Sequence, residues 1–261
     1  MGWTATASDP CLYQRGLGEQ YALLVLHVND CLITSKTKEQ LQQIEKELEC
    51  RSKIKHLGPA STFMGLKIER SEEVGMPSVG RTKYIQEILE RFGMTEGKGV
   101  DTLMVREHQQ KEENEPLNAT ELRTYQEIVG SLLYLSTLTR FDISYATWRL
   151  AKAMGGATKW DLASATRVLR NLKGQPDLKI TLRRGEFALK AHCDASYGQT
   201  ELEYKSVSGY MVMLSGGAIA RGTKKQSIIA GNKTDSELIA FDSCVKQVLF
   251  IKELLGELGI H

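Results

Sequence analysis

The spacing of apolar residues changes along this chain, and that change limits the folds open to it. Between residues 122 and 173, apolar side chains recur every three or four positions, which is the period of an amphipathic helix. From residue 179 the pattern changes to short apolar runs separated by turn residues, which is typical of strands. We therefore predict helices over 122–139, 142–154 and 160–173, strands over 179–182, 188–193, 208–214 and from 218, and a final helix over 234–258 with Leu238, Val245, Leu249 and Leu255 among its buried residues.

The N-terminal third alternates short apolar runs with turn and cap signals. His27-Val28-Asn29-Asp30 separates two apolar runs, residues 21–26 and 31–34, and Asn29 and Asp30 are its turn residues. Both residue types tolerate the left-handed backbone of tight turns, so the pattern predicts a β-hairpin. Thr37, with Gln40 three positions later, predicts a capped helix that ends near Cys50. Residues 63–68 predict a strand in a second hairpin, whose turn includes Gly75, Pro77 and Gly80. A helix is predicted over 84–92 and ends at Gly93.

Lysines and arginines are concentrated in one part of the chain. The whole sequence has 34 basic and 32 acidic residues, and its net charge of +2 predicts no partner. From Arg149 to Arg184, however, nine residues are basic and two are acidic, so the local net charge is 9 − 2 = +7. Such a stretch fits the phosphate backbone of a nucleic acid, and it equally fits a solvated helix face. Residues 107–127, with six acidic and two basic side chains, predict a surface linker.

Composition excludes several classes of protein. The five cysteines are scattered and never form a Cys-x-x-Cys pair, so neither a disulfide framework nor a zinc knuckle is predicted. The longest apolar runs fall far short of the roughly 18 residues that a membrane helix needs. Residues 1–20 lack the uninterrupted apolar segment of a secretory signal. We expect an intracellular protein, cytoplasmic or nuclear, with no membrane partner.

A series of short segments, taken in order, resembles one protein family. They include Asp9-Pro10-Cys11-Leu12-Tyr13, Leu26-His27-Val28-Asn29-Asp30, Phe63-Met64-Gly65-Leu66, Val129-Gly130-Ser131-Leu132, Thr139-Arg140-Phe141-Asp142, Asp194-Ala195-Ser196-Tyr197, Lys224-Lys225-Gln226 and Glu237-Leu238-Ile239-Ala240. The series resembles the later part of a copia-type retrotransposon Pol polyprotein: the C-terminal part of the reverse transcriptase, its connection segment and the start of its ribonuclease H domain. The resemblance covers residues 3 to 258.

This resemblance implies an α+β fold in four segments. Residues 1–96 would form a partial reverse-transcriptase palm and the start of the thumb, and residues 97–120 an acidic linker. A helical connection would follow over residues 121–176. Residues 177–261 would form a truncated ribonuclease H-like domain with a three-stranded sheet and one long helix.

The polymerase chemistry of this family uses two metal ions held by aspartates from two palm motifs. The resemblance places the first aspartate upstream of Met1 and aligns the second motif, normally Tyr-Val-Asp-Asp, with His27-Val28-Asn29-Asp30. Asn29 thus replaces a metal-binding aspartate, and its amide supplies no negative charge to Mg²⁺. We expect Asn29 and Asp30 to be vestigial catalytic residues, with Asp30 at most a weak metal ligand; from the residues alone the segment is simply a turn.

Ribonuclease H chemistry needs several carboxylates around two metal ions. The resemblance supplies Asp194 at a strand end and Glu237 at the start of the last helix, and it implies that the two side chains face each other as vestigial catalytic residues and weak Mg²⁺ ligands. From the residues alone, Asp194 is a strand-end acid and Glu237 is the third residue of a capping box with Thr234. Asp242 would point about 140° away from Glu237 on a helix, so we expect no third acid to join them.

Three functions are compatible with these observations. The resemblance favours a reverse transcriptase/ribonuclease H fragment that lacks both activities, with Mg²⁺ as the family cofactor and an RNA–DNA hybrid or other nucleic acid, together with other Pol segments, as partners. An alternative is a domesticated nucleic-acid-binding or scaffold module without catalysis. A third is an active enzyme completed by another chain. The expected nucleic-acid-binding residues are Arg167, Arg170, Lys173, Lys224 and Lys225.

Overall fold

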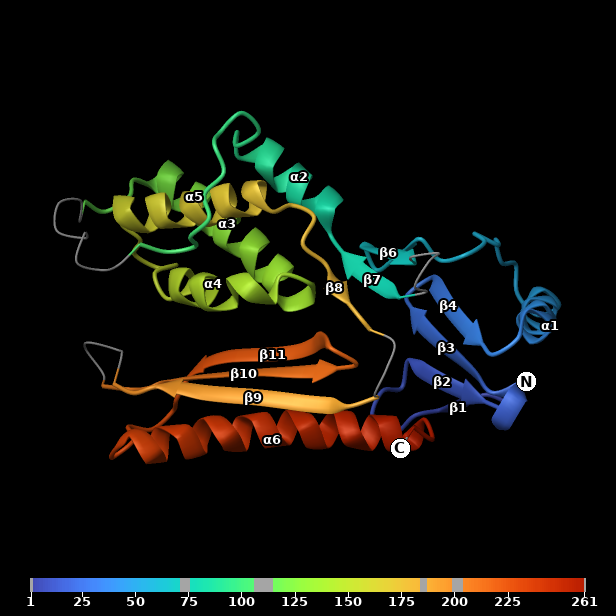
Figure 1. The fold of residues 1–261 in the computed structure, drawn as a ribbon. Coiled ribbons are helices and arrows are strands. Elements are labelled where there is room, and N and C mark those ends of the chain that lie inside the picture. Colours follow the sequence, from blue (N-terminus) through green and yellow to red (C-terminus); the bar gives the residue numbers. More distant parts are fainter. Residues whose placement is uncertain (1, 71–75, 106–114, 184–186, 199–203, 261) are drawn as a thin grey trace. The chain divides into compact units, whose positions relative to one another are not determined.

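The computed structural model describes residues 2–70, 76–105, 115–183, 187–198 and 204–260 (Figure 1). It divides into two compact units: residues 1–68 with 245–261, and residues 69–244. The mixture of helices and strands confirms the predicted α+β class. None of the helices in the described ranges is long and apolar enough to cross a lipid bilayer.

The first unit contains a four-stranded antiparallel sheet with the strand order β1-β2-β3-β4. Its strands are β1 (Thr4–Ala5), β2 (Leu12–Arg15), β3 (Ala22–His27) and β4 (Asp30–Ser35). Helix α1 (Lys38–Glu49) packs against β4 and buries Ile44. An ion pair between Arg15 of β2 and Glu47 of α1 also joins the helix to the sheet. The Arg15 hydrogen bond holds the pKa of the Glu47 carboxyl below its ordinary value.

The N-terminal turn and cap signals are confirmed in part. Thr37 caps α1 by accepting a hydrogen bond from the Gln40 amide at 3.2 Å. The single strand predicted over 63–68 is wrong: β5 (Thr62–Phe63) and β6 (Leu66–Arg70) are separate strands. Met64 and Gly65 between them adopt positive φ angles of 52° and 71°, which close a two-residue turn. Because Met64 is apolar, the sequence pattern does not indicate a turn at this position.

The second unit has a helical layer that follows the sequence prediction. Its elements are α2 (Thr82–Arg91), α3 (Ala119–Leu138), the 3₁₀ turn η3 (Phe141–Ile143), α4 (Ser144–Ala151) and α5 (Lys159–Gly174). Capping boxes open α3 and α5, and Gly93 follows α2 with a φ of 65°. Helix α4 is shorter than predicted at both ends. Part of the predicted acidic linker, residues 106–114, lies outside the described ranges, as do Gly75 and Arg184. The linker predicted over 107–127 is wrong at its end, because residues 119–127 belong to α3.

Helix α3 lies at the centre of the hydrophobic core of the second unit. The core is formed by buried side chains of α2, α3, η3, α4 and α5, among them Ile85, Ile88, Tyr125, Ile128, Val129, Leu132, Leu135, Ile143, Leu150, Val168, Leu169 and Leu172. The hydroxyl of Tyr125 is buried with them and donates a 2.6 Å hydrogen bond to the carbonyl of Leu150. Burial raises the pKa of this phenol well above its ordinary value.

The second unit also contains the predicted three-stranded antiparallel sheet, with the order β11-β10-β9. Its strands are β9 (Leu189–Ser196), β10 (Val207–Leu214) and β11 (Gly217–Lys225). The strand predicted over 179–182, β8 (Ile180–Thr181), instead pairs with β7 (Pro77–Gly80). Pro77 and Gly80 thus lie in a strand, so their predicted place in a turn is wrong. Helix α4 packs against β11, and Arg221 of that strand donates to the carbonyl and hydroxyl oxygens of Ser136 on α3.

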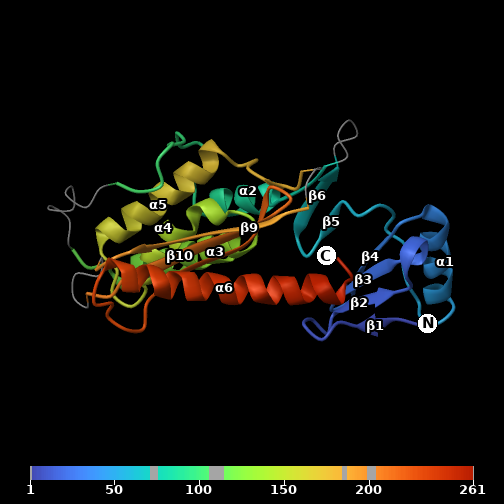
Figure 2. The same ribbon diagram turned by 60° about the horizontal axis from the view of Figure 1, so that its bottom comes forward.

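The last helix, α6 (Lys233–Glu257), matches its predicted length, and its first half lies along the β9–β11 sheet (Figure 2). The predicted burial of Leu238 and Leu249 is wrong, because they are 60% and 58% exposed. Within the second unit, α6 instead buries Ser236, Ala240 and Cys244. These small side chains, spaced four residues apart, let the helix approach the sheet closely.

The only charged side chain with no exposed surface among the described residues is that of Arg140, in the segment between α3 and η3. Its guanidinium donates to both carboxylate oxygens of Asp142, at 2.9 Å and 2.8 Å, and to the carbonyl of Gln175 just after α5, at 2.9 Å. A buried cation needs such partners because its desolvation is costly. Arg140 therefore fixes the end of α3 to the end of α5.

Replacing Asp142 by Ala is expected to destabilise the second unit strongly. The change leaves the Arg140 charge buried without its carboxylate, which costs about 3–5 kcal/mol in comparable sites. The double variant Arg140→Met/Asp142→Ala removes the charge as well and should recover part of that loss. Urea denaturation of the three proteins measures this; a double variant no more stable than Asp142→Ala would contradict the role of the buried charge.

A second prediction concerns Glu257 at the end of α6, within the first unit. Its carboxylate accepts hydrogen bonds from the hydroxyl of Ser8 at 2.6 Å and the amide of Ala7 at 2.6 Å. The hydrogen bond from the Ser8 hydroxyl, together with those from the backbone amides of Ser8 and Ala7, holds the pKa of the Glu257 carboxyl below its ordinary value. The contacts therefore stabilise the fold above the unfolded pKa of about 4.3, and this contribution is lost as the pH falls through the lower, folded pKa.

Amide exchange at Ala7 and Ser8 measures this loss between pH 6 and pH 3. We expect protection at both amides to fall with acidification more in the wild type than in Glu257→Gln, whose side chain does not titrate. Equal pH dependence in the two proteins would show that Glu257 is not the responsible group.

Candidate nucleic-acid interface and metal-binding residues

The segment His27-Val28-Asn29-Asp30 forms the tip of the predicted hairpin between β3 and β4. His27 pairs with Asp30, so Val28 and Asn29 make a two-residue turn. The left-handed residue is Val28, with a φ of 54°, rather than Asn29 or Asp30. Because Val is β-branched, this backbone conformation is strained. The hairpin prediction is confirmed, but the residue thought to permit the turn is not the one that adopts the unusual conformation.

The donor atoms at this tip do not by themselves fit a resident Mg²⁺ ion. Asp30 offers one carboxylate on an exposed turn, and the neighbouring Asn29 offers an uncharged amide. Protein-bound Mg²⁺ uses carboxylates together with substrate phosphates in a near-octahedral arrangement. Within the described ranges, no group of three or more His, Cys, Asp or Glu side chains could hold a metal ion. Asn29 and Asp30 alone therefore do not form a site that fits resident Mg²⁺.

Asp194 lies on β9, an edge strand of the sheet among the described strands, and its side chain is exposed. Its neighbour Cys193 contacts Cys244 of α6; burial raises the pKa of the Cys244 thiol, and the Cys193 thiol raises it further. Pairing of β9 with β10 is regular through this region, and successive strand residues point to opposite faces. This alternation directs Asp194 away from the face that carries α6.

Glu237 is an exposed residue in the first turns of α6. The alternative role considered for it, the third residue of a capping box with Thr234, is wrong. Asn232 caps the helix instead, by accepting a hydrogen bond from the Asp235 amide at 2.9 Å. Glu237 thus has no capping function. Its proximity to Asp194, and metal binding by either carboxylate, stay predictions.

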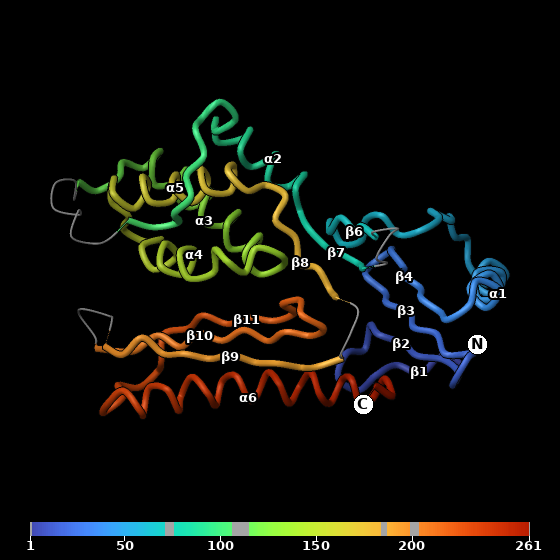
Figure 3. The backbone as a smooth tube through the Cα atoms, viewed as in Figure 1, coloured from blue at the N-terminus to red at the C-terminus, as the bar shows by residue number. Residues whose placement is uncertain are grey.

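Three of the predicted nucleic-acid-binding residues share one face of α5. Arg167, Arg170 and Lys173 are three residues apart, and each donates to a backbone carbonyl of the coil that leaves α2. Arg167 reaches the carbonyl of Thr102 at 3.1 Å, and Arg170 that of Lys98 at 3.0 Å. Figure 3 follows this coil along α5. The acceptors are neutral, so the three cations keep their full positive charge.

The same three side chains also have a structural role that the sequence pattern did not indicate. Asn171, between them on α5, donates to the carbonyls of Val100 and Asp101 at 2.9 Å and 3.1 Å. The Cα atom of Gly174 lies 2.9 Å from where a Cβ of Gly99 would stand, so only glycine fits at position 99. Residues 95–102 are thus fixed to α5 by the residues expected to bind phosphate. Removing a whole side chain would therefore change the fold as well as the charge.

The other two predicted residues, Lys224 and Lys225, end strand β11. Lys224 pairs with Ser208 of β10 and is exposed, and Lys225 pairs with Val207.

An aromatic group that the sequence analysis missed lies on α4. The rings of Tyr145 and Trp148 stack with centroids 5.7 Å apart, and the ammonium of Lys152 lies 5.2 Å from the Trp148 ring. The sequence signal for it was the spacing of three residues between Tyr145 and Trp148 and of four between Trp148 and Lys152. Aromatic faces beside cations suit the stacking of unpaired bases.

The sequence of the chain is similar to a known protein family and to several known proteins. Residues 2–106 match the family model described as reverse transcriptase (RNA-dependent DNA polymerase). The chain is 31% identical over 262 residues to the retrovirus-related Pol polyprotein from transposon TNT 1-94 of Nicotiana tabacum, a match that covers 98% of this chain and 20% of that protein. It is also 31% identical to the Pol polyproteins from transposons RE1 and RE2 of Arabidopsis thaliana, with 100% of this chain and 18% of each relative covered. The chain therefore spans about a fifth of the length of these relatives.

Proposed function

Because the chain is homologous over its whole length to part of retrotransposon Pol polyproteins, as the copia-type resemblance predicts, we propose that it is a reverse transcriptase segment that binds nucleic acid without polymerising. The observation that supports this most directly is the row of cations on α5. Their partners in the fold are neutral carbonyls, which leaves positive charge available for phosphates.

The proposed ligand is an RNA–DNA hybrid or another duplex. Contacts to phosphate carry no sequence information, so binding would be independent of sequence and strongly dependent on salt. Lys224 and Lys225 at the end of β11 would add to the same function. Other segments of a Pol polyprotein are proposed partners.

The proposed absence of polymerisation rests on Asn29. In the family motif this position is an aspartate, and its replacement removes one of the charges that hold the metal ions. Each 1.36 kcal/mol lost from transition-state stabilisation reduces the rate about tenfold, so a missing charge of this kind is severe. The exposed, strained hairpin at Val28 is compatible with a turn that no longer serves catalysis.

We also propose that residues 177–261 descend from a ribonuclease H domain. The antiparallel meander of β9, β10 and β11, followed by the long helix α6, has the order of elements that the resemblance implies. In this interpretation Asp194 and Glu237 are vestigial catalytic residues. The direction of Asp194 away from the α6 face supports the absence of nuclease activity rather than its presence.

We expect no primer extension by this protein on a primed RNA template with nucleotides and Mg²⁺ or Mn²⁺. The physical reason is the missing charge at Asn29. Extension products resolved on a denaturing gel give the measurement. Synthesis above a blank without protein, abolished by Asp30→Ala, would overturn the proposal, whereas synthesis that persists in Asp30→Ala would indicate a contaminating polymerase.

Binding to a labelled RNA–DNA hybrid should weaken steeply as salt rises. If about four phosphates are neutralised, the slope of log affinity against log salt is near −3.6, and each lost contact reduces it by about 0.9. The double variant Arg170→Gln/Lys173→Gln removes two charges but keeps a donor for each carbonyl. We expect its slope to fall to roughly −1.8, measured by fluorescence anisotropy at several salt concentrations.

The matched control for this experiment is Lys83→Gln/Arg91→Gln. Both residues are exposed on α2, outside the basic stretch, and the change in net charge is the same. Its slope should equal that of the wild type. Equal slopes in all three proteins, or no binding at low salt, would refute the proposed interface.

A further inference from the structure

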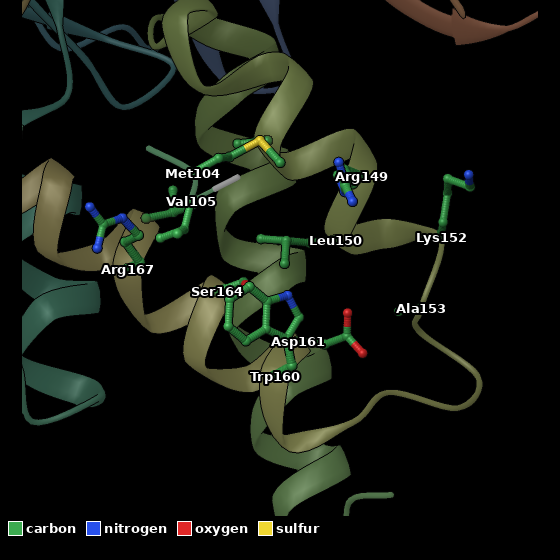
Figure 4. A pocket seen from close by; sticks show the side chains of 12 residues that line it. Met104, Val105, Arg149, Leu150, Lys152, Ala153, Trp160, Asp161, Ser164 and Arg167 are labelled. Atoms are coloured by element: carbon green, nitrogen blue, oxygen red, sulfur yellow. The ribbon is translucent and has the colours of Figure 1, made fainter. Parts of the chain in front are cut away.

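A cavity of about 240 Å³ lies between α4, α5 and the end of the coil that leaves α2 (Figure 4). Its floor is apolar and buried, with Leu150 of α4 and Val168 of α5 at 6% and 1% exposure. Met104 of the coil lines it from another side. Ligand pockets typically measure roughly 300–1,000 Å³, so this cavity is suited to one planar ring system rather than to several.

One wall of the cavity is the indole ring of Trp160, in the first turn of α5 (Figure 4). The indole N–H forms no hydrogen bond with any residue that the structure describes, and neither does the hydroxyl of Ser164, one turn further along α5. The cavity therefore presents an aromatic surface beside two polar groups that the described part of the fold leaves available. A flat, polar heterocycle matches that combination of surfaces.

Three cations line the cavity: Arg149 of α4, Lys152 directly after α4, and Arg167 of α5. Arg149 and Arg167 lie on different sides of the cavity in Figure 4. The ammonium of Lys152 forms no ion pair with the described residues and lies over the ring of Trp148. Arg167 uses part of its guanidinium on Thr102 and keeps further donors.

One acid, Asp161, also lines the cavity. Its carboxylate already accepts hydrogen bonds from the amide and the hydroxyl of Thr158, at 2.8 Å and 2.7 Å, and it caps α5 in this way. Three cations and one acid give the lining a net charge of 3 − 1 = +2. Charge complementarity thus favours an anion of low charge. A small inorganic ion would leave the apolar floor uncovered, so an anion that also carries an apolar or aromatic part fits the cavity better.

We propose that this cavity binds a single nucleotide, with its base against Trp160 and its phosphate on the side where Arg149 and Lys152 lie (Figure 4). The same chemistry has two sources: a free mononucleotide, or one unpaired nucleotide of a longer strand. The second source rests on the proposed function, because it needs nucleic acid to reach this part of the basic surface. The first does not.

The indole ¹H–¹⁵N signal of Trp160, assigned with the variant Trp160→Phe, reports occupation of the cavity. We expect adenosine 5′-monophosphate to shift it saturably, and adenosine alone or inorganic phosphate alone to bind at least about tenfold more weakly, which corresponds to 1.4 kcal/mol. A signal that high concentrations of the mononucleotide leave unchanged would overturn the proposal.

Two variants test the location of the site. Ser164→Met fills the cavity without changing charge and should abolish the shift. Ala163→Met adds the same side chain at an exposed position of the same helix, so it should bind like the wild type. Lys152→Gln, at an exposed position that cannot unfold the core, should weaken binding of the mononucleotide and leave that of adenosine unchanged. Identical behaviour of Ser164→Met and Ala163→Met, or an unchanged affinity in Lys152→Gln, would refute the assignment.

A single-stranded tetranucleotide and a blunt RNA–DNA hybrid distinguish the two sources. A shift of the Trp160 signal with the single strand but not with the blunt hybrid supports an unpaired nucleotide of a strand, and a shift with the mononucleotide alone supports the free ligand. The variant Arg170→Gln/Lys173→Gln should weaken hybrid binding and leave the mononucleotide bound. Failure of the nucleotide site and failure of the proposed hybrid interface therefore give different results.

Discussion

The arrangement of the second unit depends on a positive charge that has no contact with solvent. Arg140 follows the long central helix α3, and its guanidinium must be satisfied inside the protein because desolvation of an unpaired cation is costly. Asp142 and the carbonyl of Gln175 provide the partners. One partner belongs to η3 and the other lies at the end of α5. The hydrogen bonds of this one side chain therefore help to position α5, which carries the basic residues and lines the cavity, relative to α3.

The basic residues on α5 have a structural role and a proposed functional role that use the same side chains. Arg170 and Lys173 hold the coil over residues 95–102 through neutral carbonyls, and they are also the proposed contacts to phosphate. An arginine can do both, since its five donors point in more than one direction. For this reason a charge pattern in the sequence can be interpreted correctly as a charged surface while its structural role stays hidden.

Most secondary structure could be predicted because local signals decided it. The Thr37 cap of α1, Gly93 after α2 and the helical spacing of α3 all agree with the structure. The errors arise where tertiary packing decides. Met64 is apolar yet forms a turn, and α6 buries small residues such as Ala240 while Leu238 stays exposed. The cavity was missed because its walls come from segments far apart in the sequence, and no spacing rule joins Met104 to Trp160.

The bonds that attach the coil over residues 95–102 to α5 join a charge to a dipole, not a charge to a charge. Dissolved ions screen long-range attraction between opposite charges far more than they weaken a short hydrogen bond to a carbonyl. Release of condensed counterions, by contrast, makes contacts to a polyanion sensitive to every change in ionic strength. Salt that would displace the proposed duplex is therefore expected to leave the coil in place on α5, so the same residues would combine a reversible contact with a permanent one.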